Sequence, residues 1–174
     1  MGENATIFFV TSTVVNFDPI FQLGRDYYLI LLTSLDWVMK KYGATLFAYV
    51  FMPSHIHLVI EVDEGRSLSN LMRDFKKFTS TKIRQKLENE GRHSWVERLR
   101  KNASGKKGQV FKLWMDRFDD VVLFSESVLR TKVEYIHENP VKAGLVSVPE
   151  EWEFSSAKDY SQTGRSAFKI VMDW

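Results

Sequence analysis

Residues 44–62 read ATLFAYVFMPSHIHLVIEV, and the expected topology of the chain can be built outward from this stretch. Its two halves, 44–52 and 55–62, are rich in β-branched and aromatic residues, which is typical of strands. Only Pro53 and Ser54 separate them. The stretch therefore predicts a tight antiparallel hairpin.

Side chains along the second strand of this hairpin should point alternately to opposite faces. One face is wholly apolar, and the other carries two imidazoles about 6–7 Å apart along the strand. The apolar face holds Ile56, Leu58, Ile60 and Val62, and the other holds His55, His57, Val59 and Glu61. Two imidazoles so placed can bind one divalent ion and leave coordination positions open. A pair of surface or hydrogen-bonded histidines would have the same spacing.

Apolar periodicity and turn residues predict the remaining elements. We expect a strand over 5–15, helices over 23–41, 67–90 and 125–139, a mobile loop over 91–109, a strand over 110–117, a short helix over 155–160 and a last strand over 168–174. Gly43 should end the first helix, and Pro140 with Gly144 the third. This order predicts one domain, residues 1–174, of α+β class: a ferredoxin-like antiparallel sheet with two helices on one face and the third near the other.

The composition excludes several classes of protein. The 174-residue chain contains no cysteine, which rules out disulfides, cysteine-ligated zinc, a thiol nucleophile and iron–sulfur clusters. The start, MGENATIFF, lacks the basic and apolar regions of a secretory signal. The apolar stretch YYLILLTSLDW is much shorter than the roughly 20 residues that cross a bilayer. We therefore expect a soluble, cytoplasmic protein that does not act at a membrane.

The net charge of +2 conceals an uneven distribution. Residues 65–117 hold 15 of the 24 lysines and arginines but only 5 of the 22 acidic residues. Clustering of this kind is typical of proteins that bind a polyanion such as nucleic acid. A solvated helix followed by a charged loop would give the same pattern.

The stretch 134–144, EYIHENPVKAG, adds candidate reactive groups. On a helix, Tyr135 and Asn139 are one turn apart and share a face. The amide of Asn139 offers an oxygen ligand for a hard cation, and Tyr135 offers a phenolic nucleophile. Taken alone, a helical tyrosine more often packs and hydrogen-bonds than reacts.

These motifs together resemble the single-tyrosine HUH transposases, the IS200-like superfamily. YVFMPSHIHLVIEV (49–62) resembles their His-hydrophobe-His signature, and YIHENPVKAGLV (135–146) resembles the nucleophile helix of the REP-associated tyrosine transposase branch. Further similarity runs through RDFKKFTSTKI (73–83), LWMDRFDDVVL (113–123) and EEWEFSSAKDY (150–160). The resemblance covers roughly residues 6–160.

The resemblance implies a specific activity. Enzymes of this family cut single-stranded DNA, usually next to a small hairpin, and use Mg²⁺ or Mn²⁺. Their tyrosine forms a covalent 5′-phosphotyrosine link and releases a 3′-hydroxyl that can later rejoin strands. Carried over, Tyr135 is the nucleophile and His55 and His57 are metal ligands. Asn139 stands where other single-tyrosine transposases have a glutamine as third ligand.

The basic segment is then expected to bind the phosphates of a DNA hairpin or its flanks. The residues assigned to this role are Arg73, Lys76, Lys77, Lys82, Lys86, Lys101, Lys106 and Lys107. Two other functions remain open at this point: a ferredoxin-like nucleic-acid-binding module without catalysis, and a phosphodiesterase in which the histidine-bound metal activates water. The sequence also leaves open whether the protein is a monomer or a homodimer.

Overall fold

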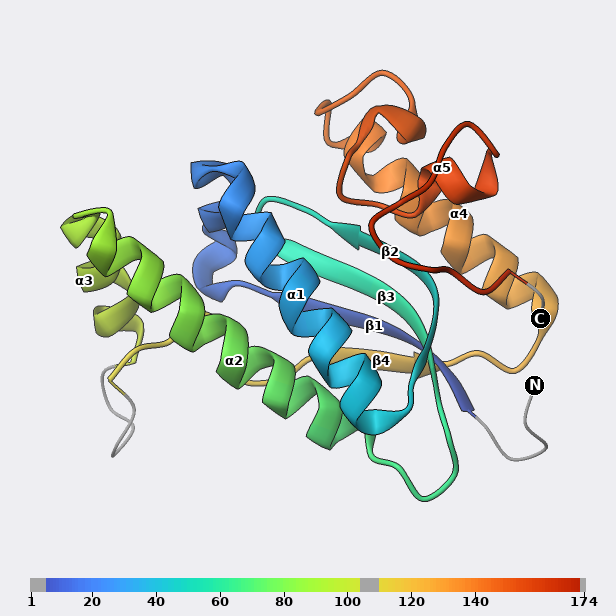
Figure 1. The fold of residues 1–174 in the computed structure, drawn as a ribbon, viewed down its shortest axis with the longest axis horizontal. Coiled ribbons are helices and arrows are strands. Elements are labelled where there is room, and N and C mark those ends of the chain that lie inside the picture. Colours follow the sequence, from blue (N-terminus) through green and yellow to red (C-terminus); the bar gives the residue numbers. More distant parts are fainter. Residues whose placement is uncertain (1–5, 104–109, 173–174) are drawn as a thin grey trace.

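The structure is a computed structural model that describes residues 6–103 and 110–172 (Figure 1). Its strands are β1 (Thr6–Thr13), β2 (Thr45–Phe51), β3 (His55–Val62) and β4 (Asp119–Val122), and its helices are α1 (Arg25–Tyr42), α2 (Leu68–Asn89), α3 (His93–Asn102), α4 (Glu126–Lys142) and α5 (Ala157–Tyr160). Short 3-10 turns lie at Val15–Phe17, Ile20–Leu23 and Pro149–Glu151. Within these described ranges, every helix is too short or too polar to cross a bilayer.

The strands form one sheet in the order β2-β3-β1-β4, and all neighbours are antiparallel. This order confirms the predicted hairpin and the ferredoxin-like topology. Strands β1 and β3 pair along their full lengths, from Thr6 opposite Val62 to Thr13 opposite His55. Strands β3 and β1 therefore form the centre of the sheet, with β2 and β4 at its two edges.

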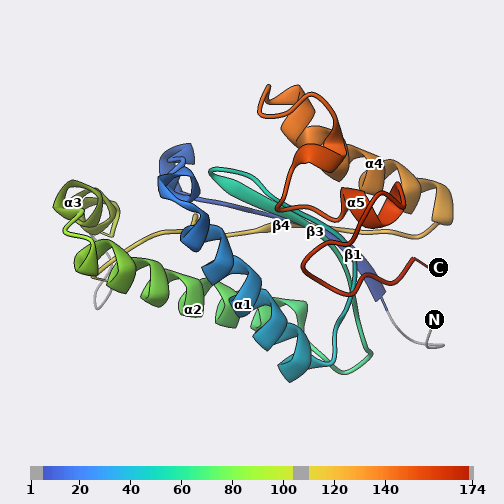
Figure 2. The same ribbon diagram turned by 45° about the horizontal axis from the view of Figure 1, so that its top comes forward.

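Helices α1 and α2 cover one face of the sheet (Figure 2). The face of β3 predicted to be apolar points into this layer, where Ile56, Leu58 and Ile60 are completely buried. Helix α1 ends, as predicted, at Gly43, which adopts the left-handed conformation (φ 61°) and donates its N–H to Met39 O. Burial of these aliphatic side chains stabilises the sheet by roughly 1.5–3 kcal/mol each.

Helix α4 packs on the opposite face, over β2 and β3 (Figure 2). Leu129, Val133 and Ile136 recur at helical spacing and enter a second apolar cluster. The Oγ atom of Ser125 accepts a hydrogen bond from Val128 N, which confirms Ser125 as the residue that caps the helix. The sheet thus has a helical layer on each face, and the third predicted helix lies on the face that carries the histidines.

The predicted end of α4 at Pro140 was wrong, since the helix continues to Lys142. A proline cannot donate a hydrogen bond to the carbonyl four residues earlier, but in the last turn only one such bond of the helix is lost. Pro140 is buried, so its ring contributes to packing instead. Gly144, at φ 69°, follows the end of the helix, as expected.

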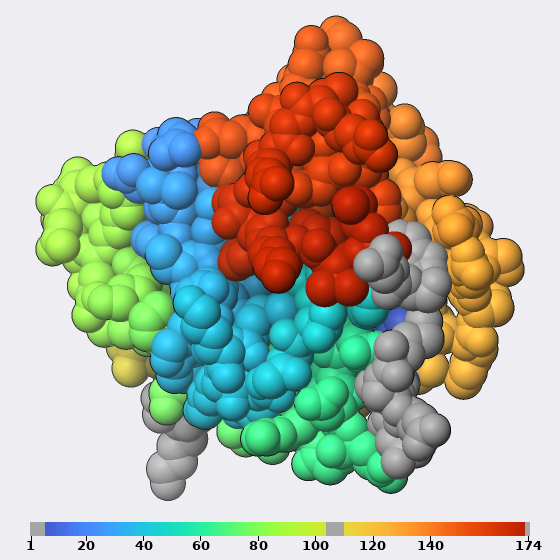
Figure 3. All heavy atoms as spheres, turned by 45° about the vertical axis from the view of Figure 1, so that its right-hand side comes forward, coloured from blue at the N-terminus to red at the C-terminus, as the bar shows by residue number. Residues whose placement is uncertain are grey.

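The C-terminal segment covers the outer edge of β2. Phe51 N donates to Phe154 O (2.8 Å), and the Tyr160 hydroxyl donates to Phe47 O (2.8 Å). In Figure 3 this segment, in red, lies between the cyan part of the N-terminal half and the orange α4. The edge of the sheet is thereby shielded from pairing with another chain.

The predicted last strand, 168–174, was wrong. Residues 168–172 are irregular, although Val171 N donates to Leu46 O at 3.1 Å. Residues 173–174 lie outside the described part of the chain. The short helix expected over 155–160 is present as α5.

The predicted loop over 91–109 was wrong for its first half, which forms α3. Val96 and Leu99, three residues apart, are buried against the main core. Half of the other residues of this helix are charged, and only Trp95 adds a partly buried apolar contact, so the apolar stripe is short and easily missed. Residues 104–109, including Lys106 and Lys107, lie outside the described part of the chain.

The predicted strand over 110–117 was also wrong. Among the described residues it contributes a single bridge, between Trp114 and Val14, and the fourth strand follows later as β4. The residues of β4, DDVV, are mostly exposed at the edge of the sheet. An exposed edge strand needs no apolar alternation, so its sequence carries little strand signal.

We predict that Leu99→Ala destabilises the protein by about 2–4 kcal/mol, because it leaves a cavity where α3 meets the core. The matched control is Lys101→Ala on the same helix, which should change the free energy of unfolding by less than about 0.5 kcal/mol. Urea unfolding followed by tryptophan fluorescence measures both. Equal effects of the two substitutions would mean that α3 does not pack as described.

Candidate active site

His55 and His57 project from the same face of β3, as the alternation predicts. Their ring centroids are 4.9 Å apart. His57 is buried, whereas His55 is partly exposed. Ile56, between them, points into the opposite layer. The backbone of one strand is therefore sufficient to bring the two imidazoles together.

Neighbouring hydroxyl groups fix one nitrogen of each ring. The Thr11 hydroxyl lies 2.8 Å from His57 Nδ1, and the Ser54 hydroxyl lies 3.3 Å from His55 Nδ1. Thr11 is placed by pairing, because it lies directly opposite His57 in the β1–β3 ladder. With Nδ1 engaged, Nε2 is the nitrogen that remains for a ligand, which is the arrangement common around metal-bound histidines.

Burial keeps both imidazoles neutral near pH 7. It is the largest of the effects that lower the pKa of His57 to about 3, and the nearby charges of His55 and Lys132 make smaller contributions in the same direction. Burial also lowers the pKa of His55, and a hydrogen bond with Asn139 acts in the other direction by raising it. Desolvation penalises the charged form of a histidine. The neutral form that results is the one that can coordinate a cation.

Helix α4 brings Tyr135 and Asn139 to the histidines. The Tyr135 ring meets the His57 ring edge to face at 5.5 Å, and its side chain is 41% exposed. Asn139 Nδ2 donates to Tyr135 O at 3.2 Å, and the same amide reaches His55. The four residues predicted from two distant motifs thus lie together.

Phe9 completes the floor of this cluster, together with Thr11. Its ring stacks on His57 (5.4 Å, 17° between planes) and meets Tyr135 edge to face at 5.9 Å. Neither residue is predicted from the sequence. Phe9 and Thr11 are two apart on β1 and so share a face, but only the register with β3 places that face beside the histidines.

A buried contact holds α4 in position. His137, two residues beyond Tyr135 but on the buried side, lies with Nε2 2.8 Å from Ser156 Oγ. Ser156 Oγ in turn accepts from Tyr49 N at 3.0 Å. This chain of hydrogen bonds ties α4 to β2 through the C-terminal segment, and so fixes the helix that carries Tyr135.

The donors in the cluster suit a divalent cation. Within residues 6–103 and 110–172 no three histidine, cysteine, aspartate or glutamate side chains converge as a metal site. Two imidazole nitrogens and the amide oxygen of Asn139 are the ligands available, and all are uncharged. Three neutral donors leave the cation's charge and its remaining positions free for water or a phosphate oxygen.

The predicted DNA-binding residues of α2 lie on the face of the sheet opposite Tyr135 (Figures 1 and 2). Two of them already have protein partners. Lys76 Nζ donates to Met115 O and Arg117 O, both at 3.0 Å, and burial lowers its pKa to about 8. Lys86 pairs with Asp26 (3.1 Å) and Glu90 (2.7 Å). These two ammonium groups contribute to the structure of the helical layer.

The other predicted cations are more accessible. Lys77 and Lys82 are exposed on α2, and Arg73 is exposed with only a long contact to Asp74 (3.4 Å). Lys101 lies in α3, 3.6 Å from Glu97. Of the predicted set, Arg73, Lys77 and Lys82 are thus the α2 residues best placed to meet a phosphate.

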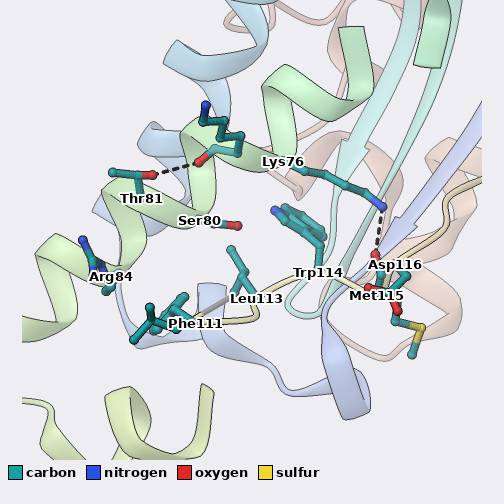
Figure 4. A pocket seen from close by; sticks show the side chains of 11 residues that line it. Lys76, Ser80, Thr81, Arg84, Phe111, Leu113, Trp114, Met115 and Asp116 are labelled. Atoms are coloured by element: carbon teal, nitrogen blue, oxygen red, sulfur yellow. Dashed lines mark hydrogen bonds between the residues drawn. The ribbon is translucent and has the colours of Figure 1, made fainter. Parts of the chain in front are cut away.

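A pocket of about 440 Å³ lies between α2 and residues 110–116 (Figure 4). Lys77 and Arg84 line it from α2, and Phe111 lines it from the opposite segment. Trp114 forms its inner wall, with Nε1 donating to Thr79 Oγ1 at 2.8 Å. The pocket is therefore cationic on one side and aromatic on the other, and it is separate from the histidines and Tyr135.

The sequence matches a known family. Residues 25–139 match the family described as Transposase IS200 like, and the chain belongs to that family. The matched range contains both histidines, Tyr135 and Asn139. Members of a transposase family are enzymes that act on DNA.

Three individual proteins are similar to this chain over most of its length. A Haemophilus influenzae protein described as a REP-associated tyrosine transposase is 26% identical over 144 residues, which cover 83% of this chain and 76% of the relative. The solved structure of a REP-associated tyrosine transposase bound to a REP hairpin superposes with a TM-score of 0.66, 22% identity and coverage of 97% of this chain and 88% of the other. A transposase structure from Deinococcus radiodurans gives a TM-score of 0.52 at 12% identity, over 79% and 94% of the two chains.

We predict that Ser156→Ala lowers the free energy of unfolding by about 1–3 kcal/mol, because it leaves His137 and the Tyr49 amide without a buried partner. The exposed Ser161→Ala on the following turn is the control, and we expect less than about 0.5 kcal/mol from it. Chemical denaturation measures both. A loss no greater than that of the control would contradict the role assigned to this hydrogen-bond chain.

Proposed function

We propose that this protein is a metal-dependent single-stranded DNA endonuclease and strand transferase that uses Tyr135 as its nucleophile. The observation that carries the proposal is that a partly exposed tyrosine lies beside two neutral imidazoles and an amide. The centroids of the Tyr135 and His57 rings are 5.5 Å apart. Membership of the IS200-like transposase family supports it. The two open alternatives lack a use for a tyrosine at this position.

In the proposed reaction, Tyr135 Oη attacks the phosphorus of one phosphodiester. A bond forms between Oη and phosphorus, the bond from phosphorus to the 3′-oxygen breaks, and that oxygen leaves as a 3′-hydroxyl after it takes a proton. The phenol proton passes to solvent. The 5′-phosphate remains linked to Tyr135, so the energy of the phosphodiester is conserved and a 3′-hydroxyl can reverse the step.

His55, His57 and Asn139 are proposed to hold the divalent ion, Mg²⁺ or Mn²⁺. When bound, such an ion neutralises charge on the scissile phosphate as a Lewis acid. Thr11 keeps the His57 ring turned with Nε2 toward the cluster through its contact with Nδ1. Phe9 shields the other side of that ring from water by stacking.

The DNA substrate is proposed to contain a hairpin, by analogy with the relative whose structure holds a REP hairpin. Arg73, Lys77 and Lys82 would contact phosphates of the part of the DNA that lies away from the bond that is cut, because α2 is on the far face of the sheet. Phosphate contacts of this kind position the DNA without reading its sequence.

We predict that Tyr135→Phe abolishes covalent attachment while DNA binding changes by less than about threefold, because only the hydroxyl is lost. The assay incubates the protein with oligonucleotides tiled over the DNA that flanks its gene, each with and without its hairpin, in Mg²⁺ or Mn²⁺. Intact-protein mass spectrometry then detects an added 3′-side fragment.

The same assay separates the alternatives. A mass increase that depends on Tyr135 supports the tyrosine mechanism. Cleavage without any adduct would favour a water-activating phosphodiesterase, and salt-sensitive binding without cleavage on any tiled substrate would favour a module that only binds.

We also predict that His57→Ala reduces adduct formation by at least about 100-fold and that added metal does not restore it, since an essential ligand is lost. His93→Ala is the matched control, because His93 belongs to α3, which lies at the end of the molecule away from α4 (Figure 1), and it should react as the native protein does. Unchanged cleavage in His57→Ala would show that the metal lies elsewhere.

A further inference from the structure

Helix α4 carries four functional groups in one stripe. Lys132, Tyr135, Asn139 and Lys142 are spaced three, four and three residues apart, which places them on one face of a helix. Each lysine Nζ lies 5.7 Å from the centroid of the Tyr135 ring. The tyrosine is thus flanked by a cation toward each end of the helix.

Lys132 reaches inward from this stripe. Its side chain is half-buried, and Nζ lies 4.7 Å from the centroid of Phe9, the ring that stacks on His57. A cation–π contact recovers only about 0.5–2 kcal/mol of the cost of desolvating an ammonium group.

Within the described ranges, neither lysine has an acidic partner. Among the described residues, no carboxylate oxygen lies within 4 Å of Lys132 or Lys142. Arg130 on the same helix shows the contrast, because it pairs with Glu126 at 2.6 Å. Two cations beside one tyrosine, with no carboxylate near them in the described part of the chain, create a positive potential that favours binding of an anion at this point.

We propose that Lys132 and Lys142 form a phosphate-binding site of the transposase centre, and that they hold the phosphates on either side of the bond presented to Tyr135. The inference deepens the proposed function and rests on it for the identity of the ligand, a single-stranded DNA backbone. The site is distinct from the cations of α2, which lie across the sheet. Its role is to hold the strand along α4 so that a phosphodiester meets the Tyr135 hydroxyl.

The first test measures binding in the absence of chemistry. Tyr135→Phe protein, which keeps the ring, is titrated with a fluorescein-labelled single strand from the flanking DNA between about 50 and 200 mM salt. Lys132→Gln and Lys142→Gln in this background should each reduce the slope of log affinity against log salt by about 0.7, the value for one phosphate contact on a single strand. Arg130→Gln removes a paired cation from the same helix and should leave the slope unchanged.

The second test restores Tyr135 and measures single-turnover adduct formation at saturating DNA. Lys132→Gln and Lys142→Gln should each slow it by about 10-fold or more, and Lys→Arg at either position should recover most of the rate because a cation is retained. A slope that does not change, or that changes equally in Arg130→Gln, would overturn the inference. Failure of the native protein to form any adduct would instead overturn the proposed function, and the binding slopes would still decide the phosphate site.

Discussion

Alternation of side chains along β3 is the constraint on which the centre depends. Ile56, Leu58 and Ile60 are fully buried beneath α1 and α2, so the residues between them must face the other way. A slip of one residue in register would bury both histidines in the apolar layer and expose those aliphatic side chains. Because several buried aliphatic groups each stabilise the native register by about 1.5–3 kcal/mol, the core itself fixes the direction of His55 and His57.

Helix α4 carries the other two residues of the centre, Tyr135 and Asn139. Helix α4 is held by Leu129, Val133 and Ile136 in the second apolar cluster and by the His137–Ser156 contact. Tyr135 and Asn139 lie beside this buried stripe and therefore next to the histidines, and Tyr135 stays partly exposed. For the proposed role of Tyr135, a packed helix is a suitable support, because it positions a side chain more precisely than a loop does and group transfer depends on orientation.

The hairpin and α4 could be predicted because their signals are local: strict alternation in one, and helical periodicity with a serine cap in the other. The pairing of Tyr135 and Asn139 with the histidines came from family resemblance, and the sheet topology then explained it. Helix α3 was missed because its buried stripe is only Val96 and Leu99 in a charged stretch. Strand β4 was missed because an exposed edge needs no apolar pattern. The contributions of Phe9 and Thr11 depend on the register between β1 and β3, which no single segment encodes.

Together, β3 and α4 are proposed to form one metal-binding centre beside Tyr135. Diffraction at the manganese absorption edge from crystals equilibrated with Mn²⁺ tests it most directly. We predict an anomalous peak about 2.1 Å from Nε2 of His55 and His57 and from Oδ1 of Asn139. An anomalous peak at another place only, or no peak at this site when the protein is saturated with Mn²⁺, would contradict this arrangement.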